Sequence, residues 1–460
     1  MSLLPSLVSP VDGAFLLPET RDQPMHVGSL QLFLPPPDSD VHDLSEIYLT
    51  ALGTAEIAPL FRKRLTRGVT TLGQWAWEED AGIDLEHHVR HSSLPRPGRM
   101  RELLALCSRL HGTLLDRQRP LWEMHLIEGL EDGRFAVYTK IHHALLDGVS
   151  GLRLLERSLS KDPSERDVPM PFAARPRSGR KAGGLDVAGL MSAGLHAALD
   201  AVTLAPKTAR LVEQGIRHRS AVLPGQAPRS MLNVPITGSR RFAGDAWELD
   251  RIRAVAKKAD ATINDIVLAM SAGALRDYLL GLDALPEESL TAMTPVSLRT
   301  STSTDDSAEG NAVGAILVSL GTHLADAEER LLHIRDSSRR AKASLKGLSQ
   351  LQITALSAGI MAPLVLNTAL GSLPGVRPPF NLIISNVPGP KKPLYWNGAK
   401  LDGMYPLSIP TAGQALNITC TSYDTQLQFG LTGCRRTLPH LQSMLVGLDE
   451  ALTALEKAFA

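Results

Sequence analysis

The chain has 460 residues, a length that exceeds one ordinary domain and favours two or three. Basic and acidic side chains number 48 each, so the chain lacks the net positive charge that is typical of nucleic-acid-binding proteins. A local basic patch that binds a membrane surface is still compatible with this balance. Three widely separated cysteines, Cys107, Cys420 and Cys434, form no CxxC pair; this argues against a disulfide scaffold or a zinc ribbon and favours a reducing cytosol. The N-terminal residues show no basic stretch followed by an apolar core, so no signal peptide is expected.

The first clear elements lie in the N-terminal third. Residues 101–117 place leucines at helical spacing and predict an amphipathic helix. Residues 120–130 alternate apolar and polar side chains, and residues 134–143 form a second strand-like run after the turn-forming "EDG". Together they predict a β-hairpin whose second strand ends at two adjacent histidines.

A change in composition follows this hairpin. Residues 161–184 are rich in Pro, Arg, Ser and Gly and predict an exposed connection, which a helical stretch near 185–214 extends. A second loop-like segment near 223–230 precedes the C-terminal half. The expected organisation is an N-terminal domain, a crossover with helices, and a C-terminal domain: 1–160, 161–230 and 231–460.

The C-terminal half again mixes helix and strand signals. Residues 261–280 predict a helix that begins with a capping box made by Thr262 and Asp265. Strand-like runs occur at 290–298, 312–320, 380–387, 415–423 and 427–433. Residues 347–376 carry no charge, but their polar side chains and Pro363 favour buried helices over a membrane-spanning one.

The stretch "YTKIHHALLDGVSG" places His142 and His143 at the end of a strand. Successive side chains of a strand point to opposite faces, so the two imidazoles are poorly placed to share a metal, and no HExxH or cysteine pair adds ligands. Two ordinary core histidines are one alternative. A general base at the strand end is the other, with Asp147 and Gly148 shaping the turn. "GVSGL" is not a GxSxG nucleophile motif, so a base would activate a substrate hydroxyl or amine.

"HHALLDG" matches the HHxxxDG signature of the coenzyme-A-dependent acyltransferase superfamily, which includes chloramphenicol acetyltransferase and condensation domains. Further blocks in the same order resemble the bacterial wax ester synthase/diacylglycerol acyltransferase family. These blocks are "SPVDGAFLLPETRDQPMHVGSLQLF", "PLWEMHLIEGL", "ATINDIVLAMSAGALRDYL", "PVSLR", "FNLIISNVPGPKKPLYWNGAKL" and "YPLSIPTAGQALNITCTSYDTQLQFGLTGCRRTLP". The resemblance covers nearly the whole chain except residues 161–230.

The resemblance implies an α/β fold with mixed sheets, built as two chloramphenicol-acetyltransferase-like domains around a central tunnel. It implies transfer of a long-chain fatty acyl group from acyl-CoA to a fatty alcohol, giving a wax ester, or to diacylglycerol, giving triacylglycerol. His143 would be the base in a direct attack, with no acyl-enzyme, no metal and no cofactor beyond acyl-CoA as substrate. It also implies a cytoplasmic protein held peripherally at the inner membrane face or at lipid inclusions.

Other residues receive roles that stay open. His142 is expected to pack or hydrogen-bond on the other face, and the resemblance pairs Asp147 with an arginine, for which Arg299 is the choice; a surface charge is the alternative for Arg299. Asn264 could donate to the reaction's oxyanion, with Asp265 beside it in the active-site wall, or both could simply cap a helix. Three residues could form active-site wall: Glu19, otherwise a solvated loop carboxylate, and Ser385 and Asn386, otherwise part of a turn.

The uncharged segment suits a long acyl chain, since each buried methylene contributes about 0.8 kcal/mol. Leu356, Ile360, Met361, Ala362 and Leu364 could line such a slot, or they could belong to an ordinary core helix.

Two competing functions remain at this stage. One is a condensation-like transferase that uses a carrier-protein thioester, although the chain carries no fused carrier domain. The other is a non-catalytic lipid-binding or lipid-droplet protein, against which the intact "HHALLDG" motif argues.

Overall fold

The computed structural model describes residues 6–36, 44–146, 148–174, 224–297, 313–346 and 377–460, together with residues 348, 352, 353, 356, 357, 359 and 360. Asp147, Arg299, Met361, Ala362 and Leu364 lie outside these residues, as do most of the predicted crossover and most of the uncharged segment. No helix in the described part of the chain is long and apolar enough to cross a membrane.

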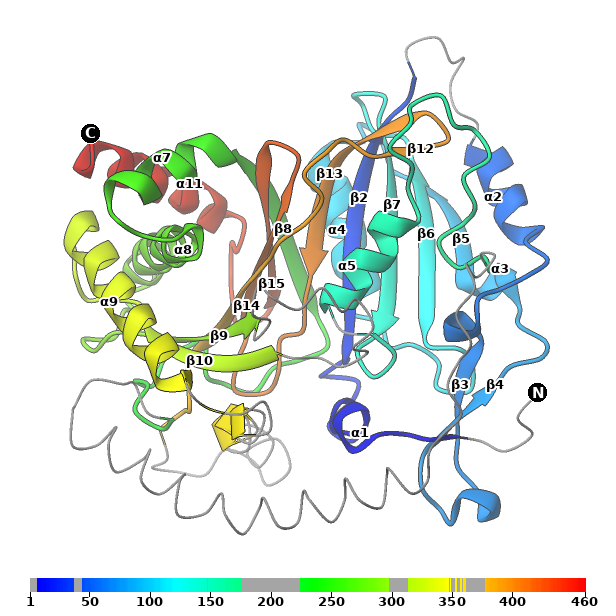
Figure 1. Ribbon diagram of the computed structural model, residues 1–460, viewed down its shortest axis with the longest axis horizontal. Coiled ribbons are helices and arrows are strands. Elements are labelled where there is room, and N and C mark those ends of the chain that lie inside the picture. The colour runs from blue at the N-terminus through cyan, green and yellow to red at the C-terminus, as the bar shows by residue number, and fades with distance from the viewer. Residues whose placement is uncertain are drawn as a thin grey trace.

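Two six-stranded mixed sheets lie side by side, one in each half of the molecule (Figure 1). The N-terminal sheet has the order β12-β13-β2-β7-β6-β5, and only β5 and β6 pair in parallel. Its strands are β2 (His26–Leu34), β5 (Val89–Ser93), β6 (Trp122–Glu128), β7 (Phe135–His142), β12 (Tyr395–Trp396) and β13 (Ala399–Leu407). The predicted hairpin is confirmed as β6 and β7.

The C-terminal sheet has the order β10-β9-β11-β14-β15-β8, with β11 parallel to both of its neighbours. Its strands are β8 (Arg240–Glu248), β9 (Thr291–Ser297), β10 (Val313–Ser319), β11 (Leu382–Val387), β14 (Leu416–Tyr423) and β15 (Gln426–Cys434). All five strand-like runs predicted for this half are therefore strands. The mixed α/β class expected from the resemblance is confirmed.

Helices cover the sheets. In the N-terminal half these are α1 (Pro10–Leu16), α2 (Leu44–Leu52), η1 (Pro59–Arg62), η2 (Val69–Thr71), α3 (Leu85–His88), α4 (Met100–His111) and α5 (Gly148–Arg157). In the C-terminal half they are α7 (Leu249–Lys258), α8 (Ile263–Leu280), α9 (Ala327–Leu345) and α11 (Ser443–Ala458). A small sheet, β1-β4-β3, stands apart with strands β1 (Ser6–Leu7), β3 (Lys63–Thr66) and β4 (Ala76–Glu79).

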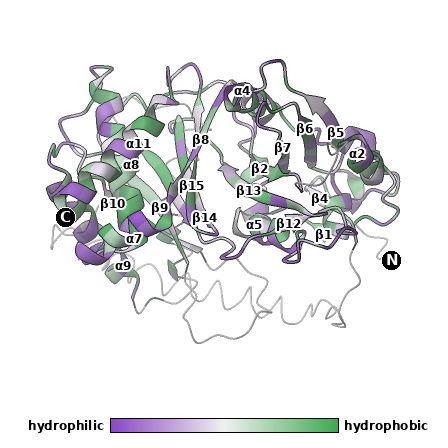
Figure 2. Cartoon of the chain, turned by 90° about the horizontal axis from the view of Figure 1, so that it is seen from above, coloured by the Kyte–Doolittle hydropathy of each residue, from purple (hydrophilic) through white to green (hydrophobic). Residues whose placement is uncertain are grey.

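Helix α8 is the centre of the C-terminal core, and Figure 2 shows hydrophobic residues along it. It starts with the predicted capping box: the Thr262 hydroxyl accepts from the Asp265 amide at 3.2 Å, and the Asp265 carboxylate accepts from the Thr262 amide at 2.9 Å. Gly273 allows α11 to approach closely, because a Cβ there would lie 2.7 Å from that of Ala451. Burial on nearly all sides explains why α8 shows little amphipathic pattern.

Strand β13 belongs to the C-terminal half of the sequence but pairs with β2 of the N-terminal sheet, and Figure 1 shows its orange ribbon beside the blue β2. The Met404 amide of β13 donates to the side chain of Gln428 in β15, and the amide of Ser408, just past β13, donates to the side chain of Thr432. A division at residue 231 therefore does not separate the two sheets, because residues 395–407 of the expected C-terminal domain complete the N-terminal one.

Residues 161–167, where the connection after α5 begins, are exposed as their composition predicts, but the segment that follows them is not. Val168, Met170 and Phe172 are buried against the N-terminal core. Ser160 and Tyr395 exchange two backbone hydrogen bonds of 2.8 Å. The prediction was wrong for these three apolar residues because the tertiary packing of alternate apolar side chains outweighed a Pro- and Arg-rich composition.

Candidate active site

The histidine pair lies where β7 ends and the chain turns toward α5. Strand alternation directs Tyr138, Lys140 and His142 to one face, where Tyr138 and Lys140 contact the end of α4. His143 follows the last strand residue, and its amide donates to the carbonyl oxygen of Met25 at 2.9 Å. The sheet therefore fixes the backbone of both histidines.

His142 is fully buried, with Nδ1 in a hydrogen bond and Nε2 beside a carboxylate. Its Nδ1 accepts from the Ala144 amide at 3.0 Å, so the ring proton resides on Nε2. Nε2 lies 3.3 Å from Oε1 of Glu19. Because His142 is fully buried and both of its ring nitrogens face protein groups, neither nitrogen is open to a substrate.

Glu19 lies between His142 and Arg117, a residue of the segment that follows α4. The carboxylate accepts from the Met25 amide and from Nε of Arg117, both at 3.0 Å, and forms an ion pair with Nη2 of Arg117 at 2.9 Å. Burial raises the pKa of Glu19, but His142, the Met25 amide and Arg117 outweigh it, and the net pKa is lowered. The side chain is 2% exposed, so Glu19 is a buried part of the site and not a solvated loop carboxylate.

His143 is half-buried and stacks on Phe15 of α1, with ring centroids 4.0 Å apart and an interplanar angle of 18°. Helix α1 is anchored by Ser9, whose hydroxyl accepts from the Asp12 amide at 3.1 Å. The stacked phenyl ring limits rotation of the imidazole, so α1 helps to orient His143.

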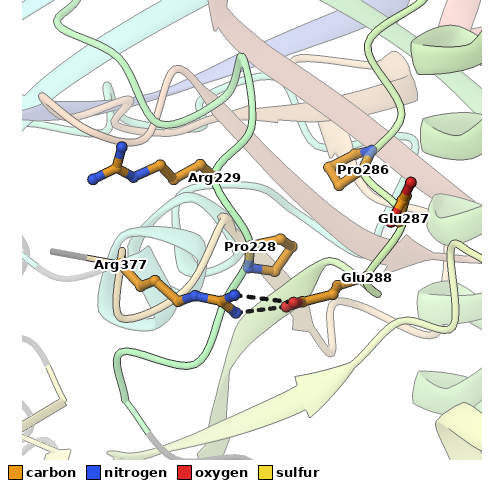
Figure 3. Close-up of a pocket in the computed structure, with 6 residues that line it drawn as sticks. All are labelled: Pro228, Arg229, Pro286, Glu287, Glu288 and Arg377. Carbon is orange, nitrogen blue, oxygen red and sulfur yellow. Dashed lines mark hydrogen bonds and ion pairs between the residues drawn. The ribbon is translucent and has the colours of Figure 1, made fainter. Parts of the chain in front are cut away.

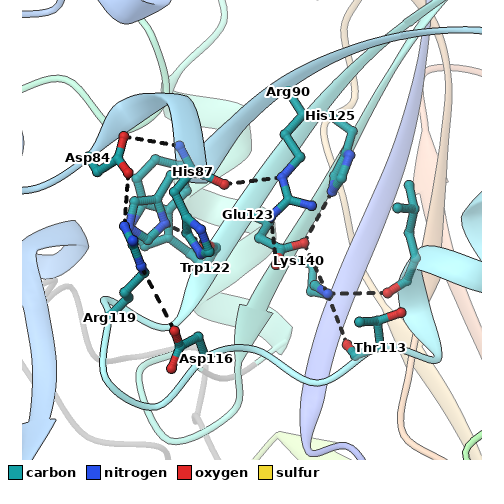
Figure 4. Close-up of polar contacts among 12 residues, drawn as sticks. Asp84, His87, Arg90, Thr113, Asp116, Arg119, Trp122, Glu123, His125 and Lys140 are labelled. Atoms are coloured by element: carbon teal, nitrogen blue, oxygen red, sulfur yellow. Dashed lines mark hydrogen bonds and ion pairs between the residues drawn. The ribbon is translucent and has the colours of Figure 1, made fainter.

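A buried ionic group lies behind this site (Figure 4). The Lys140 ammonium is fully buried and donates to the carbonyl oxygens of Leu110 and Thr113 at the end of α4, and it lies 3.1 Å from Glu123 Oε2. His125 Nε2 lies 3.2 Å from the same oxygen. Burial raises the pKa of Glu123, but His125 and Lys140 outweigh it and lower the pKa to about 2.

Sequence reasoning missed this group, although a signal was present. Glu123 and Lys140 are opposite charges in two otherwise apolar strands, and they face each other directly in the β6–β7 register. His111, which follows on the same face, is neutral because burial lowers its pKa to about 3. Its Nδ1 accepts from the Tyr138 hydroxyl and its Nε2 donates to the carbonyl oxygen of Ser408, both at 2.9 Å. Residue 408, just past β13, is thereby bonded to the layer behind His142.

The structure places the remaining predicted residues as follows. Gly148 is the first residue of α5, and a Cβ there would meet no atom within 4 Å. Asn264 is half-buried in the first turn of α8, beside the capping Asp265. Ser385 and Asn386 lie within β11, opposite Thr419 and Cys420 of β14, so they are strand residues and not yet part of a turn. No hydrogen bond, ion pair or ring contact recorded for the described residues joins any of these four to His143.

Two of the five predicted acyl-slot residues fall in the described part of the chain. Ile360 is buried against Met293, Leu317 and Phe380, and Leu356 packs on the main C-terminal core. Both positions are compatible with core packing, which leaves the acyl slot a prediction.

A surface depression of about 590 Å³ lies elsewhere, between Pro228, Arg229, Pro286, Glu287, Glu288 and Arg377 (Figure 3). The Arg377 guanidinium spans it and pairs with Glu288 at 2.6 and 3.0 Å. None of these residues belongs to the histidine motif or to the groups that hold it, so the depression is not the site of the chemistry.

The sequence matches the models of one protein family over most of its length. The wax ester synthase/diacylglycerol acyltransferase catalytic domain matches residues 8–267, and the C-terminal domain of the same family matches residues 309–456. The chain belongs to the wax ester synthase/diacylglycerol acyltransferase family. It is 48% identical, over 98% of its length and 99% of theirs, to Mycobacterium tuberculosis and Mycobacterium bovis proteins named as diacylglycerol O-acyltransferases.

Solved structures agree with this assignment. The wax ester synthase/diacylglycerol acyltransferase from Marinobacter aquaeolei VT8 superposes with a TM-score of 0.79 at 43% identity, covering 99% of both chains. The first condensation domain of the CDA synthetase matches with a TM-score of 0.59 at 16% identity, covering 100% of this chain and 97% of that one, which shows a shared fold alone. The chain is an acyl-CoA-dependent O-acyltransferase of this family, with a two-domain condensation-like fold.

Proposed function

We propose that this chain transfers a long-chain acyl group from acyl-CoA to the hydroxyl of diacylglycerol or of a fatty alcohol, with His143 as general base. The names of the mycobacterial relatives favour diacylglycerol as the acceptor. The observation that carries the assignment of the base is the state of His142, whose two ring nitrogens face Ala144 and Glu19. Proton transfer therefore falls to His143, half-buried at the start of the turn.

The proposed reaction needs one base and no acyl-enzyme. His143 accepts the proton of the acceptor hydroxyl while its oxygen attacks the thioester carbonyl carbon. The tetrahedral oxyanion then collapses, the carbon–sulfur bond breaks, and the imidazolium returns the proton to the thiolate of coenzyme A. The products are an ester and free coenzyme A, with no added cofactor or metal.

Several supporting roles belong to the same proposal. Asn264, on the first turn of α8, would donate to the oxyanion. Asp147 and Arg299 would pair to hold the turn after the histidines. The acyl chain would lie along the segment that contains Leu356 and Ile360. The protein would act at the cytoplasmic face of a membrane or on lipid inclusions, where its acceptors are concentrated.

The test is thiol release from palmitoyl-CoA, measured in parallel with dipalmitoylglycerol and hexadecanol. His143→Ala should lower kcat by about 10²–10⁴-fold while palmitoyl-CoA binding, measured by calorimetry, stays within twofold. His323→Ala removes an exposed histidine of the C-terminal half and serves as the matched control. Undiminished turnover in His143→Ala would contradict the assignment of the base. Absence of thiol release with both acceptors would overturn the proposal in favour of a carrier-bound donor or a non-catalytic lipid-binding role.

A further inference from the structure

The connection between β3 and β4, residues 67–75, carries the two most exposed large hydrophobic side chains of the described residues. Val69 is 93% exposed and Leu72 is 89% exposed. Leu17, just after α1, is 79% exposed, and Figure 1 shows α1 and this connection along the same edge of the molecule. We name residues 67–75 the β3–β4 tip. An apolar cluster at a loop tip marks an interaction site more often than isolated surface leucines do.

The tip is held in one conformation that directs these side chains outward. The Thr71 hydroxyl accepts from the Gly68 amide at 3.1 Å and donates to the carbonyl oxygen of Gln74 at 2.7 Å. Leu72 occupies the left-handed region with φ of 50°, which Gly, Asn or Asp would adopt at lower cost. A leucine kept exposed in a costly conformation indicates that its apolar side chain is used.

The charges of the tip fit a phospholipid surface. Its sequence "RGVTTLGQW" contains no acidic residue. The Arg67 guanidinium donates to the Gly73 carbonyl oxygen and lies 5.6 Å from the centre of the Trp75 ring, which forms a cation–π contact. Two projecting aliphatic side chains with an arginine and a tryptophan at their base are typical of segments that insert into the headgroup boundary.

The tip is also physically joined to the candidate active site. Val8, between β1 and α1, donates its amide to the Trp75 carbonyl oxygen at 3.0 Å. Arg117 lies 5.9 Å from the Trp75 ring centre while it binds Glu19, the carboxylate beside His142. Trp75 further packs on the small apolar cluster that also contains Phe15, the ring stacked on His143.

We propose that the β3–β4 tip docks the protein on an anionic phospholipid bilayer. Val69 and Leu72 enter the acyl boundary, Arg67 and Trp75 lie among the headgroups, and Leu17 widens the contact from α1. Docking in this orientation turns α1 and the His143 side of the molecule toward the lipid in which a water-insoluble acceptor dissolves. The inference rests on the proposed function only for the identity of that acceptor.

The experiment is flotation of the full chain with vesicles of phosphatidylcholine containing one-quarter phosphatidylglycerol. The test variant is Val69→Ser with Leu72→Asn, because asparagine accepts the left-handed backbone and so keeps the tip folded. The matched control is Leu49→Ser with Val446→Ser, which removes two hydrophobic side chains that are 65% and 60% exposed on α2 and α11. The test variant should lower the partition coefficient by about tenfold or more, and the control should stay within twofold.

A second variant separates charge from apolar insertion. Arg67→Gln should weaken flotation with the anionic vesicles by about fivefold and leave binding to pure phosphatidylcholine nearly unchanged. The proposal would be overturned if the Val69→Ser, Leu72→Asn variant floated as strongly as the wild type. It would also be overturned if the control variant lost as much vesicle binding as the test variant. A drop in the oligomeric state of that variant in size-exclusion chromatography, with vesicle binding intact, would assign the tip to a second copy of the chain and overturn it as well.

Thiol release separates a failure of docking from a failure of the proposed function. With decanoyl-CoA and dissolved octanol as acceptor, the tip variant should keep wild-type turnover. With diacylglycerol held in the anionic vesicles, its rate should fall about as much as its partitioning. If wild-type protein releases no thiol from any acceptor yet floats with the vesicles, the proposed function fails while the docking surface stands.

Discussion

Glu19→Gln tests how much the active site depends on the carboxylate behind the histidine pair. Glu19 is 2% exposed, and it faces His142, the Met25 amide and two nitrogens of Arg117. Loss of one partner from a buried charged group costs about 3–5 kcal/mol. Here the amide oxygen still accepts one hydrogen bond and Arg117 is 32% exposed, so water can replace part of the loss. We expect a destabilisation of about 1–3 kcal/mol.

The same substitution should affect turnover through the orientation of His142. Without the carboxylate, Nε2 of His142 loses its charged neighbour and the Met25 amide loses a charged acceptor, so the turn that carries His143 can shift. Misplacement of a reacting group by about 1 Å costs up to about a hundredfold, so kcat should fall by about 10- to 100-fold with KM for acyl-CoA unchanged. Thermal unfolding and thiol release from palmitoyl-CoA measure the two effects, and Glu19→Asp should recover part of the kcat.

The pH dependence gives an independent check with a defined sign. The pKa of Glu19 is lowered from 4.5 in the folded chain, so its contribution to stability is present above pH 4.5 and is lost as the pH falls below that value. The stability gap between wild type and Glu19→Gln should therefore narrow in acid. Glu288→Gln is the matched control, because it breaks an exposed glutamate–arginine pair and should change neither stability nor kcat appreciably. A Glu19→Gln enzyme with full kcat would refute the positioning role.

Four further substitutions test other parts of the structure. Glu123→Gln should lower the free energy of unfolding by up to about 3 kcal/mol at pH 7. Because folding lowers the pKa of Glu123 from 4.5 to about 2, the difference in stability between wild type and variant should disappear between pH 4.5 and pH 2, as measured by urea unfolding. Gly430→Ala should destabilise the chain by about 1–3 kcal/mol or more in the same assay, because the added Cβ would overlap the carbonyl oxygen of Pro406 in β13. Gly13→Ala is the control: a Cβ at Gly13 would meet no atom within 4 Å and should not destabilise the chain. Thr262→Ala should cost about 1 kcal/mol of stability at constant kcat. Asn264→Ala should lower kcat by about 10²–10³-fold at constant stability if its amide binds the oxyanion, and an unchanged kcat would leave it a helix-start residue only.

Local signals in the sequence predicted much of the fold. The β6–β7 hairpin and helix α8 were predicted correctly because alternation, a turn tripeptide and a capping box all act within a few residues of each other. The pairing of β13 with β2 joins segments more than 350 residues apart, for which a single sequence carries no local signal. The burial of Val168, Met170 and Phe172 was missed for the same reason, since their partners lie elsewhere in the chain.

For the candidate site, the sequence predicted the motif histidines but not the buried charged residues that surround them. The family motif pointed to His143 as the base and strand alternation gave His142 a separate role, but the carboxylate beside His142 is Glu19, 123 residues earlier. Glu19 entered the sequence analysis only as one of two alternatives, because nothing in its neighbours distinguishes a buried carboxylate from an exposed one. Lys140 was missed although its charge in an apolar strand is unusual, and a lysine at such a position is stable only with partners from other elements.

The arrangement of β13 shows why the catalytic half of this chain cannot be understood as a separate unit. The family's catalytic-domain match ends at residue 267, yet the edge of β2 is covered by residues 399–407. The carbonyl oxygen of Ser408 accepts from His111, which in turn holds the hydroxyl of Tyr138 on the face of β7 that ends with His142. Without this segment, β2 would be an open edge and His111 would lose a buried partner, at the site directly behind the motif. The C-terminal half therefore supports β7, the strand that ends with His142, through hydrogen bonds that run by way of His111 and Tyr138.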